Sequence, residues 1–286
     1  EPRRDRQAGG PAGLPGDGMK IASILRGGPV LALALMLSAW GRFAGASEPA
    51  SPVAGDQAVT EALKPIQQKY NLPAIAGAIV TGTGLEVCGV VGVRKSGTTV
   101  PASLDDRWHL GSDTKAMTAT LVGSLVEQGL LQWNTTVAEL FPDLASAFDP
   151  ALKTVTIQHL LSHRAGLPAN LSSPWFKVGD DGSPQEQRLE ALKLALSRKP
   201  EFTPGSKFQY SNLGYVIVGA MVEKVTGKSW EEAIQERVFQ PLEMKSAGFG
   251  GTGTPGQIDQ PWGHLDGGRP VAGNGPAADN PPVLGP

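Results

Sequence analysis

The order of the predicted elements, with two strands near the start and most helices after them, limits the folds open to this chain more than any other feature. Two β-rich runs, at 74–81 and 85–94, are joined by the turn Gly82-Thr83-Gly84 and predict a hairpin. One face of the second run carries apolar residues at period two, which are Leu85, Val87, Val91 and Val93. A stretch before the hairpin, 57–70, has apolar residues close to the 3.6-residue period and predicts an amphipathic helix that Pro73 ends. Strands followed by helices predict an α+β domain.

The later part of the chain carries helix start and stop signals. A largely buried helix is expected to open at Ser112 and to close at Gly129, which is placed as a C′ glycine. Thr156 is a candidate N-cap for a short helix, and Gly166 is a candidate stop signal for it. Two further helices are expected, at 213–225 and 230–238.

Composition limits the function classes. The 286 residues include 25 Lys and Arg against 27 Asp and Glu, a net charge of −2, so the sequence shows no basic footprint for nucleic acid. A small neutral or polar substrate fits this charge better. Cys88 is the single cysteine, so an intrachain disulfide and a thiolate zinc cluster cannot form; we expect this thiol to be buried in a strand.

The N-terminal part has the order of an export signal. From Met19 a basic stretch precedes the apolar run Val30–Trp40, and Ala44-Gly45-Ala46 then forms an A-x-A site. The apolar run has 11 residues, whereas a transmembrane helix needs about 20. We therefore expect cleavage before Ser47, export to the periplasm or medium, and no stable membrane span afterwards.

These signals predict how the chain is divided. The expected parts are an upstream tail outside the fold at 1–18, a signal peptide at 19–46, a Ser/Pro/Ala linker at 47–55 and one domain at 56–286.

One motif indicates nucleophilic chemistry. Serine needs a base within hydrogen-bond reach, and Ser112-Asp113-Thr114-Lys115 is an S-x-x-K at the start of a predicted helix, where residues three apart share a face. By itself this spacing is expected about once by chance in a chain of this length. The G-x-S-x-G elbow is absent, whereas spacing alone leaves a Ser/His/Asp triad open. An alternative reading is a metal site, because His159 and His163 are four residues apart and could both bind one ion. No third ligand is spaced with them.

The wider context of this motif resembles the nucleophile block of serine β-lactamases, penicillin-binding proteins and their esterase relatives, the class C β-lactamase-related group. The block runs from Arg107 to Gly129, and Tyr210-Ser211-Asn212 looks like the family's Y-x-N element. The segments 156–167 and 239–244 are also similar to family segments, and all blocks stand in family order over about 56–285. The resemblance implies an antiparallel sheet covered by helices, with an inserted helical lobe.

The resemblance also implies roles for four residues. Ser112 attacks an acyl carbonyl, Lys115 takes its proton, Tyr210 relays that proton to the leaving group, and Asn212 positions substrate and Lys115. The expected activity is an acyl-enzyme serine hydrolase acting on an ester, a D-amino-acid peptide or a β-lactam, without a cofactor or metal. The alternative is a non-catalytic, penicillin-recognising module of the same fold. Oligomeric state and substrate identity cannot be derived from these motifs.

The family's third element, Lys-Thr-Gly or His-x-Gly on a late strand, has no match here. His264-Leu265-Asp266-Gly267 has a different spacing and lies in Gly- and Pro-rich sequence that predicts loop from Gly250 onward, with His264 exposed. Because the earlier blocks are intact, we expect the late strands and this element to lie beyond Pro286, so that the domain is incomplete at its C-terminus.

Overall fold

A computed structural model describes residues 55–171, 182–271 and 281–286. They belong to one compact unit, Pro52–Pro286. The expected tail and signal peptide lie outside the described residues, as does nearly all of the expected linker. Within the described ranges, the structure contains no helix with the length and apolar character needed to cross a membrane.

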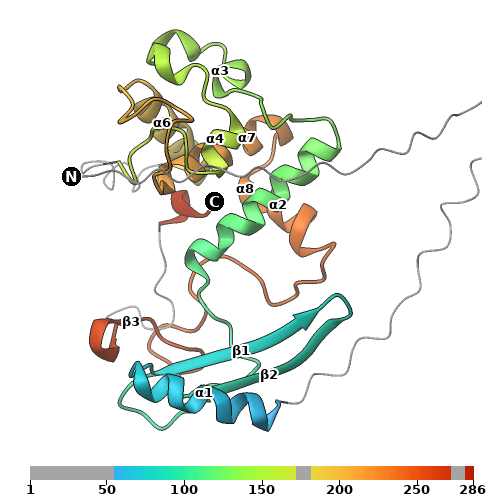
Figure 1. The fold of residues 1–286 in the computed structure, drawn as a ribbon, viewed down its shortest axis with the longest axis vertical. Coiled ribbons are helices and arrows are strands. Elements are labelled where there is room, and N and C mark those ends of the chain that lie inside the picture. The colour runs from blue at the N-terminus through green and yellow to red at the C-terminus, as the bar shows by residue number, and fades with distance from the viewer. Residues whose placement is uncertain (1–54, 172–181, 272–280) are drawn as a thin grey trace, which may run out of the picture. The chain divides into compact units, whose positions relative to one another are not determined.

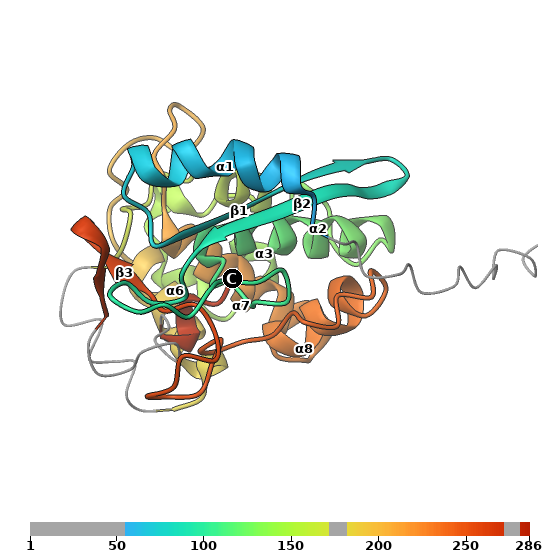
Figure 2. The ribbon, with the colours of Figure 1, turned by 90° about the horizontal axis from the view of Figure 1, so that it is seen from below.

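The predicted hairpin is present and is covered by the first helix. β1 (Ala74–Thr81) and β2 (Gly84–Gly92) pair antiparallel, and α1 (Gln57–Lys69) packs along them (Figures 1 and 2). Asp56 caps α1 by accepting a hydrogen bond from the Val59 N–H at 2.9 Å.

Two details of the hairpin differ from the prediction. The register shifts between Ile79 and Val80, so the period-two face of β2 does not continue to the turn, and Leu85 is 44% exposed. Cys88 lies on β2 as expected but is only half-buried. β2 ends at Gly92, whose φ of +107° and close approach to Pro73 leave no room for a Cβ.

The helices form a separate core around one buried helix. In α7 (Asn212–Thr226) ten successive residues, Leu213–Val222, are buried, which is the pattern of a helix enclosed on all sides. The surrounding helices, all in contact with α7, are α2 (Thr114–Glu127), α3 (Val137–Leu140), α4 (Ile157–Leu161), α6 (Pro184–Leu196) and α8 (Trp230–Ile234). The sheet and helices together are the expected α+β architecture.

Helix ends follow the sequence signals in most places. Gly129 and Gly227 take left-handed conformations after α2 and α7. Thr156 caps α4 as predicted, and α4 ends at Leu161, before the candidate stop signal Gly166, because the chain turns at His163 (φ +57°). The helix expected at 230–238 is α8 followed by a π-helical segment, Gln235–Phe239.

The Gly- and Pro-rich part after Gly250 is less irregular than predicted. β3 (His264–Leu265) pairs with β4 (Arg269–Pro270), and a 3-10 turn, Pro282–Leu284, packs on α6 and α7. His264 was expected to be exposed, but it is half-buried, and its Nε2 accepts the Ser96 N–H at 3.1 Å.

Candidate active site

Ser112 lies at the N-terminal end of α2, in a short 3-10 turn, Gly111–Asp113, that leads into the helix. The α-helix therefore starts two residues later than predicted. A 3-10 turn brings side chains at i and i+3 to the same side, so Ser112 and Lys115 still face each other. Gly111 enters the turn with φ +53°, a conformation that glycine adopts without a steric penalty.

The loop before Ser112 is fixed by a buried carboxylate. Asp106 accepts hydrogen bonds from the Arg94 guanidinium, the Ser103 hydroxyl and the Ser103 backbone N–H. Burial raises the pKa of Asp106, but the hydrogen bonds to Arg94 and Ser103 outweigh it and leave the pKa below its usual value. Asp106 thus joins the end of the hairpin to the chain that carries the nucleophile.

The structure brings all four predicted site residues together. Lys115 Nζ lies 3.3 Å from Ser112 Oγ and donates to Asn212 Oδ1 at 3.0 Å. Tyr210 Oη lies 2.7 Å from Ser112 Oγ. The serine hydroxyl is therefore in hydrogen-bond contact with both groups that could exchange its proton.

Tyr210 and Asn212 reach Ser112 because they flank the N-cap of α7. Ser211 is that N-cap, and its Oγ accepts the Gly214 N–H at 3.0 Å. Ser211 Oγ also donates to the Pro168 carbonyl at 2.7 Å, which ties the start of α7 to the segment after α4.

The surroundings of Tyr210 lower the pKa of its hydroxyl. Burial raises the pKa of the Tyr210 hydroxyl, but hydrogen bonding to Ser112 and Lys115 and the charge of Lys115 together lower it below its usual value. A phenol with a lowered pKa exchanges a proton with a neighbouring amine or hydroxyl more readily.

Two contacts of this site were not predicted. Asn170 Oδ1 accepts a hydrogen bond from Asn212 Nδ2 at 3.0 Å, which turns the other end of the Asn212 amide toward Lys115. His163 lies against Tyr210, with ring centroids 4.6 Å apart. Both belong to the segment between α4 and the residues near 171, so no local sequence pattern links them to Ser112.

The histidine pair considered for a metal is used differently. His159 Nδ1 accepts the Thr156 N–H at 3.3 Å in a capping box, whereas His163 Nδ1 accepts the Ser211 N–H at 3.1 Å. Among the residues that the structure describes, no cluster of three or more His, Cys, Asp or Glu could hold a metal ion.

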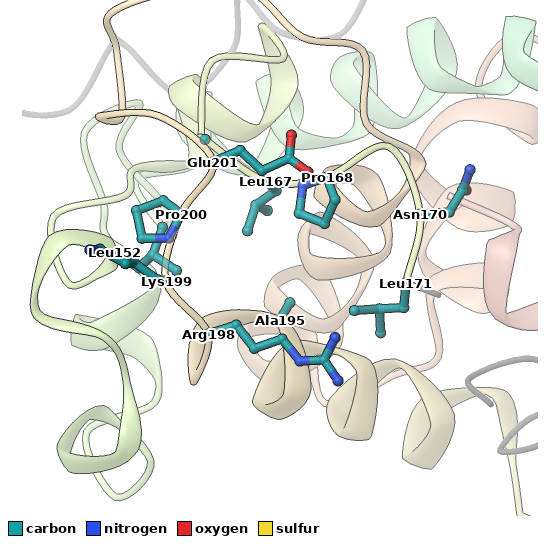
Figure 3. Close-up of a pocket in the computed structure, with 11 residues that line it drawn as sticks. Leu152, Leu167, Pro168, Asn170, Leu171, Ala195, Arg198, Lys199, Pro200 and Glu201 are labelled. Carbon is teal, nitrogen blue, oxygen red and sulfur yellow. The ribbon is translucent and has the colours of Figure 1, made fainter. Parts of the chain in front are cut away.

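A cavity of about 410 Å³ adjoins Asn170 (Figure 3). Its buried apolar lining includes Leu152, Leu167, Leu171 and Ala195, and Arg198, Lys199 and Glu201 add charged groups. Ser112 is not part of this lining, but Asn170 is shared between the cavity and the hydrogen-bonded site.

Comparison with known proteins identifies relatives of this chain. The chain is 31% identical to penicillin-binding protein 4 from Amycolatopsis lactamdurans, over 63% of this chain and 45% of that protein. It is 29% identical to an unguisins hydrolase from Aspergillus campestris, over 67% of this chain and 36% of that protein. The chain thus spans less than half the length of either relative.

Solved structures share the fold. SurE matches with a TM-score of 0.58 and 26% identity, over 77% of this chain and 49% of that one. An octameric penicillin-binding protein homologue from Pyrococcus abyssi matches with a TM-score of 0.62 and 25% identity, over 78% of this chain and 51% of that one. The family profile described as Beta-lactamase matches residues 59–283. This chain is therefore a member of the β-lactamase family.

Proposed function

We propose that this protein is a serine hydrolase that forms an acyl-enzyme on Ser112. The observation that carries the proposal is the contact of Ser112 Oγ with both Lys115 Nζ, at 3.3 Å, and Tyr210 Oη, at 2.7 Å. A serine held by a base and a second proton carrier is the arrangement that activates a hydroxyl as a nucleophile.

The proposed reaction has two steps. Ser112 Oγ bonds to the acyl carbon while its proton moves to the Lys115 amine. The bond to the leaving group then breaks, and Tyr210 passes the proton to the departing oxygen or nitrogen. Water next adds to the Ser112 ester and releases the acid, which restores the serine hydroxyl.

Two further groups have proposed roles in this reaction. Asn212 holds Lys115 through its Oδ1 and positions the substrate, and Asn170 keeps the Asn212 amide in that orientation. The Ser112 backbone N–H supplies one donor of the oxyanion hole. A donor of this kind contributes about 3 to 4 kcal/mol to the transition state of acyl transfer.

The substrate classes are an ester, a peptide with a D-amino acid, or a β-lactam. The support for these classes comes from the names of relatives alone. Two of them are a penicillin-binding protein and a hydrolase of unguisins. A third is SurE, which is 27% identical to this chain and whose structure was solved with D-Leu. Peptides with a D-residue are therefore the first natural substrates to assay.

Labelling with a serine-directed probe tests the nucleophile. A fluorophosphonate should modify the folded protein, and peptide mass spectrometry should place the adduct on Ser112. Heat-unfolded protein is the control and should stay unlabelled, because the reaction needs Lys115 and Tyr210 in place. An adduct on another serine, or equal labelling of unfolded protein, would refute the assignment.

Turnover separates the enzyme from a binding module of the same fold. With a chromogenic ester, an enzyme should release product beyond one equivalent per Ser112. A single equivalent that remains attached would instead support the non-catalytic, penicillin-recognising alternative.

We propose that the protein is exported, because residues 19–46 have the order of a signal peptide. The mature protein should begin at Ser47, which N-terminal sequencing of the exported protein checks. Mature protein that still carries residues 19–46 would contradict the proposal.

A further inference from the structure

His163 holds the backbone on both sides of Tyr210. Its carbonyl oxygen accepts the Gln209 N–H at 2.8 Å, and its Nδ1 accepts the Ser211 N–H at 3.1 Å. The residues directly before and after Tyr210 are therefore both bonded to this one histidine. The left-handed backbone at His163, φ +57°, is a conformation in which His and Asn are enriched over most residues.

The imidazole also contacts the ring of Tyr210. The two ring centroids lie 4.6 Å apart at 33°, and on another side the imidazole lies 5.3 Å from Tyr215 and edge-on to Phe208 at 5.6 Å. Tyr215 Oη donates to the Leu161 carbonyl at 3.0 Å, so the ring that backs His163 is itself fixed. Tyr210 thus rests on a packed group of rings on one side and reaches Ser112 with its hydroxyl.

The neutral imidazole suits these contacts. Burial lowers the pKa of His163, and the nearby Lys115 charge lowers it further, although the bond from Ser211 acts in the opposite direction. The neutral ring with its proton on Nε2 leaves Nδ1 free to accept the Ser211 N–H, whereas a protonated ring would turn two donors toward each other.

We propose that His163 is a positioning residue of this active site, which sets where the Tyr210 hydroxyl lies against Ser112 Oγ. This inference rests on the proposed hydrolase function for its effect on rate. The position of Tyr210 itself can be measured without any substrate.

Two variants separate the ring contact of His163 from its role as a hydrogen-bond acceptor. His163→Phe keeps a ring against Tyr210 but has no acceptor for the Ser211 N–H. His163→Asn loses the ring but keeps a short acceptor near the position of Nδ1 and tolerates the left-handed backbone. If the acceptor fixes Tyr210, the Asn variant recovers function that the Phe variant loses.

His159 offers matched controls, His159→Phe and His159→Asn. It lies on α4 and likewise accepts a backbone N–H, from Thr156, through Nδ1. Loss of this acceptor weakens a helix cap, which typically costs about 1 kcal/mol of stability. The His159 variants therefore report the effect of structural damage near the site without altering Tyr210.

The first readout is the titration of Tyr210. The chain has three tyrosines, so in a Tyr70→Phe background only Tyr210 and Tyr215 absorb as phenolates. The pKa of Tyr210 is lowered by its contacts with Ser112 and Lys115, and burial raises that of Tyr215, so the first phenolate to appear on raising pH is Tyr210. His163→Phe should move this first step to higher pH, and His163→Asn should bring it back toward the parent.

The second readout is the acylation of Ser112. His163→Phe should lower kcat and kcat/KM for a chromogenic ester together by about 10- to 100-fold, because a shift of about 1 Å in a reacting group costs up to about 10²-fold. KM should stay near the parent value, His163→Asn should recover most of the rate, and the His159 variants should match the parent.

The outcomes are distinct. An unchanged Tyr210 titration in His163→Phe, whatever its thermal stability, overturns the positioning role, as would equal losses of kcat in the His159 variants. A titration that shifts as expected in a protein never labelled on Ser112 keeps the positioning role and refutes the hydrolase proposal instead.

Discussion

Replacing Lys115 with methionine should slow the acylation of Ser112 by about 10²- to 10⁴-fold, the usual contribution of a general base. Methionine keeps most of the length and apolar volume of the lysine stem, so the α2 helix should keep its packing. The variant lacks the amine that contacts Ser112 Oγ at 3.3 Å and Asn212 Oδ1 at 3.0 Å. Stopped-flow measurement of the acylation step with a chromogenic ester gives the rate directly.

A lysine outside the site is the control for this change. Lys64, in α1, pairs with Glu61 on an exposed surface, and Lys64→Met should leave the acylation rate unchanged. If Lys115→Met acylates as fast as Lys64→Met, Lys115 is not the base. Tyr210, at 2.7 Å from Ser112 Oγ, would then be the group to test as the base.

The site could be predicted from sequence where its geometry is local. Ser112 and Lys115 are three residues apart on one helical turn, so helix geometry alone brings them together. Tyr210 and Asn212 are about a hundred residues away, and only the resemblance to a family connected them to Ser112. Asn170 and His163 contact the start of α7 from the segment that follows α4, and no spacing rule expresses such contacts.

The fold shows the same division between local and tertiary information. Most helix ends could be predicted from capping residues and glycines, because these signals act within one turn of the helix. The bulge between Ile79 and Val80, by contrast, depends on how β1 pairs with β2. His264 was misjudged because its partner, the Ser96 N–H, lies 168 residues away.

Arg188 is the clearest case of a tertiary role hidden in an ordinary sequence context. It sits in α6 among other charged residues, where a solvated side chain would be expected, yet its side chain is fully buried. The guanidinium pairs with Glu223 of α7 and Glu231 of α8 and donates to the Pro282 carbonyl at 2.9 Å. One cation thus joins three helices and the last described segment.

Replacing Arg188 with methionine should lower the free energy of unfolding by about 3 kcal/mol. Breaking a buried ion pair from one side costs about 3 to 5 kcal/mol, and the lower end applies because Glu231 remains 24% exposed. Glu223 is the main source of this cost, since it is only 10% exposed and would keep a buried charge without its partner. Urea denaturation at constant m-value measures the loss.

The pH dependence of that loss identifies its cause. Burial raises the pKa of Glu223 even beside Arg188, and without the guanidinium the pKa should rise further. A carboxyl whose folded-state pKa lies above its unfolded value loses stability as pH rises past the unfolded value. The deficit of Arg188→Met should therefore shrink as pH is lowered through the range in which Glu223 takes up its proton.

Two further variants decide between a charge effect and a simple loss of packing. Lys228→Met removes an exposed cation from its pair with Glu236 and should cost less than about 1 kcal/mol. Adding Glu223→Gln and Glu231→Gln to Arg188→Met removes the unpaired charges and should recover part of the lost stability. If the triple variant is no more stable than Arg188→Met, and the deficit does not change with pH, then Arg188 stabilises this core through the contacts of its stem and not through its charge.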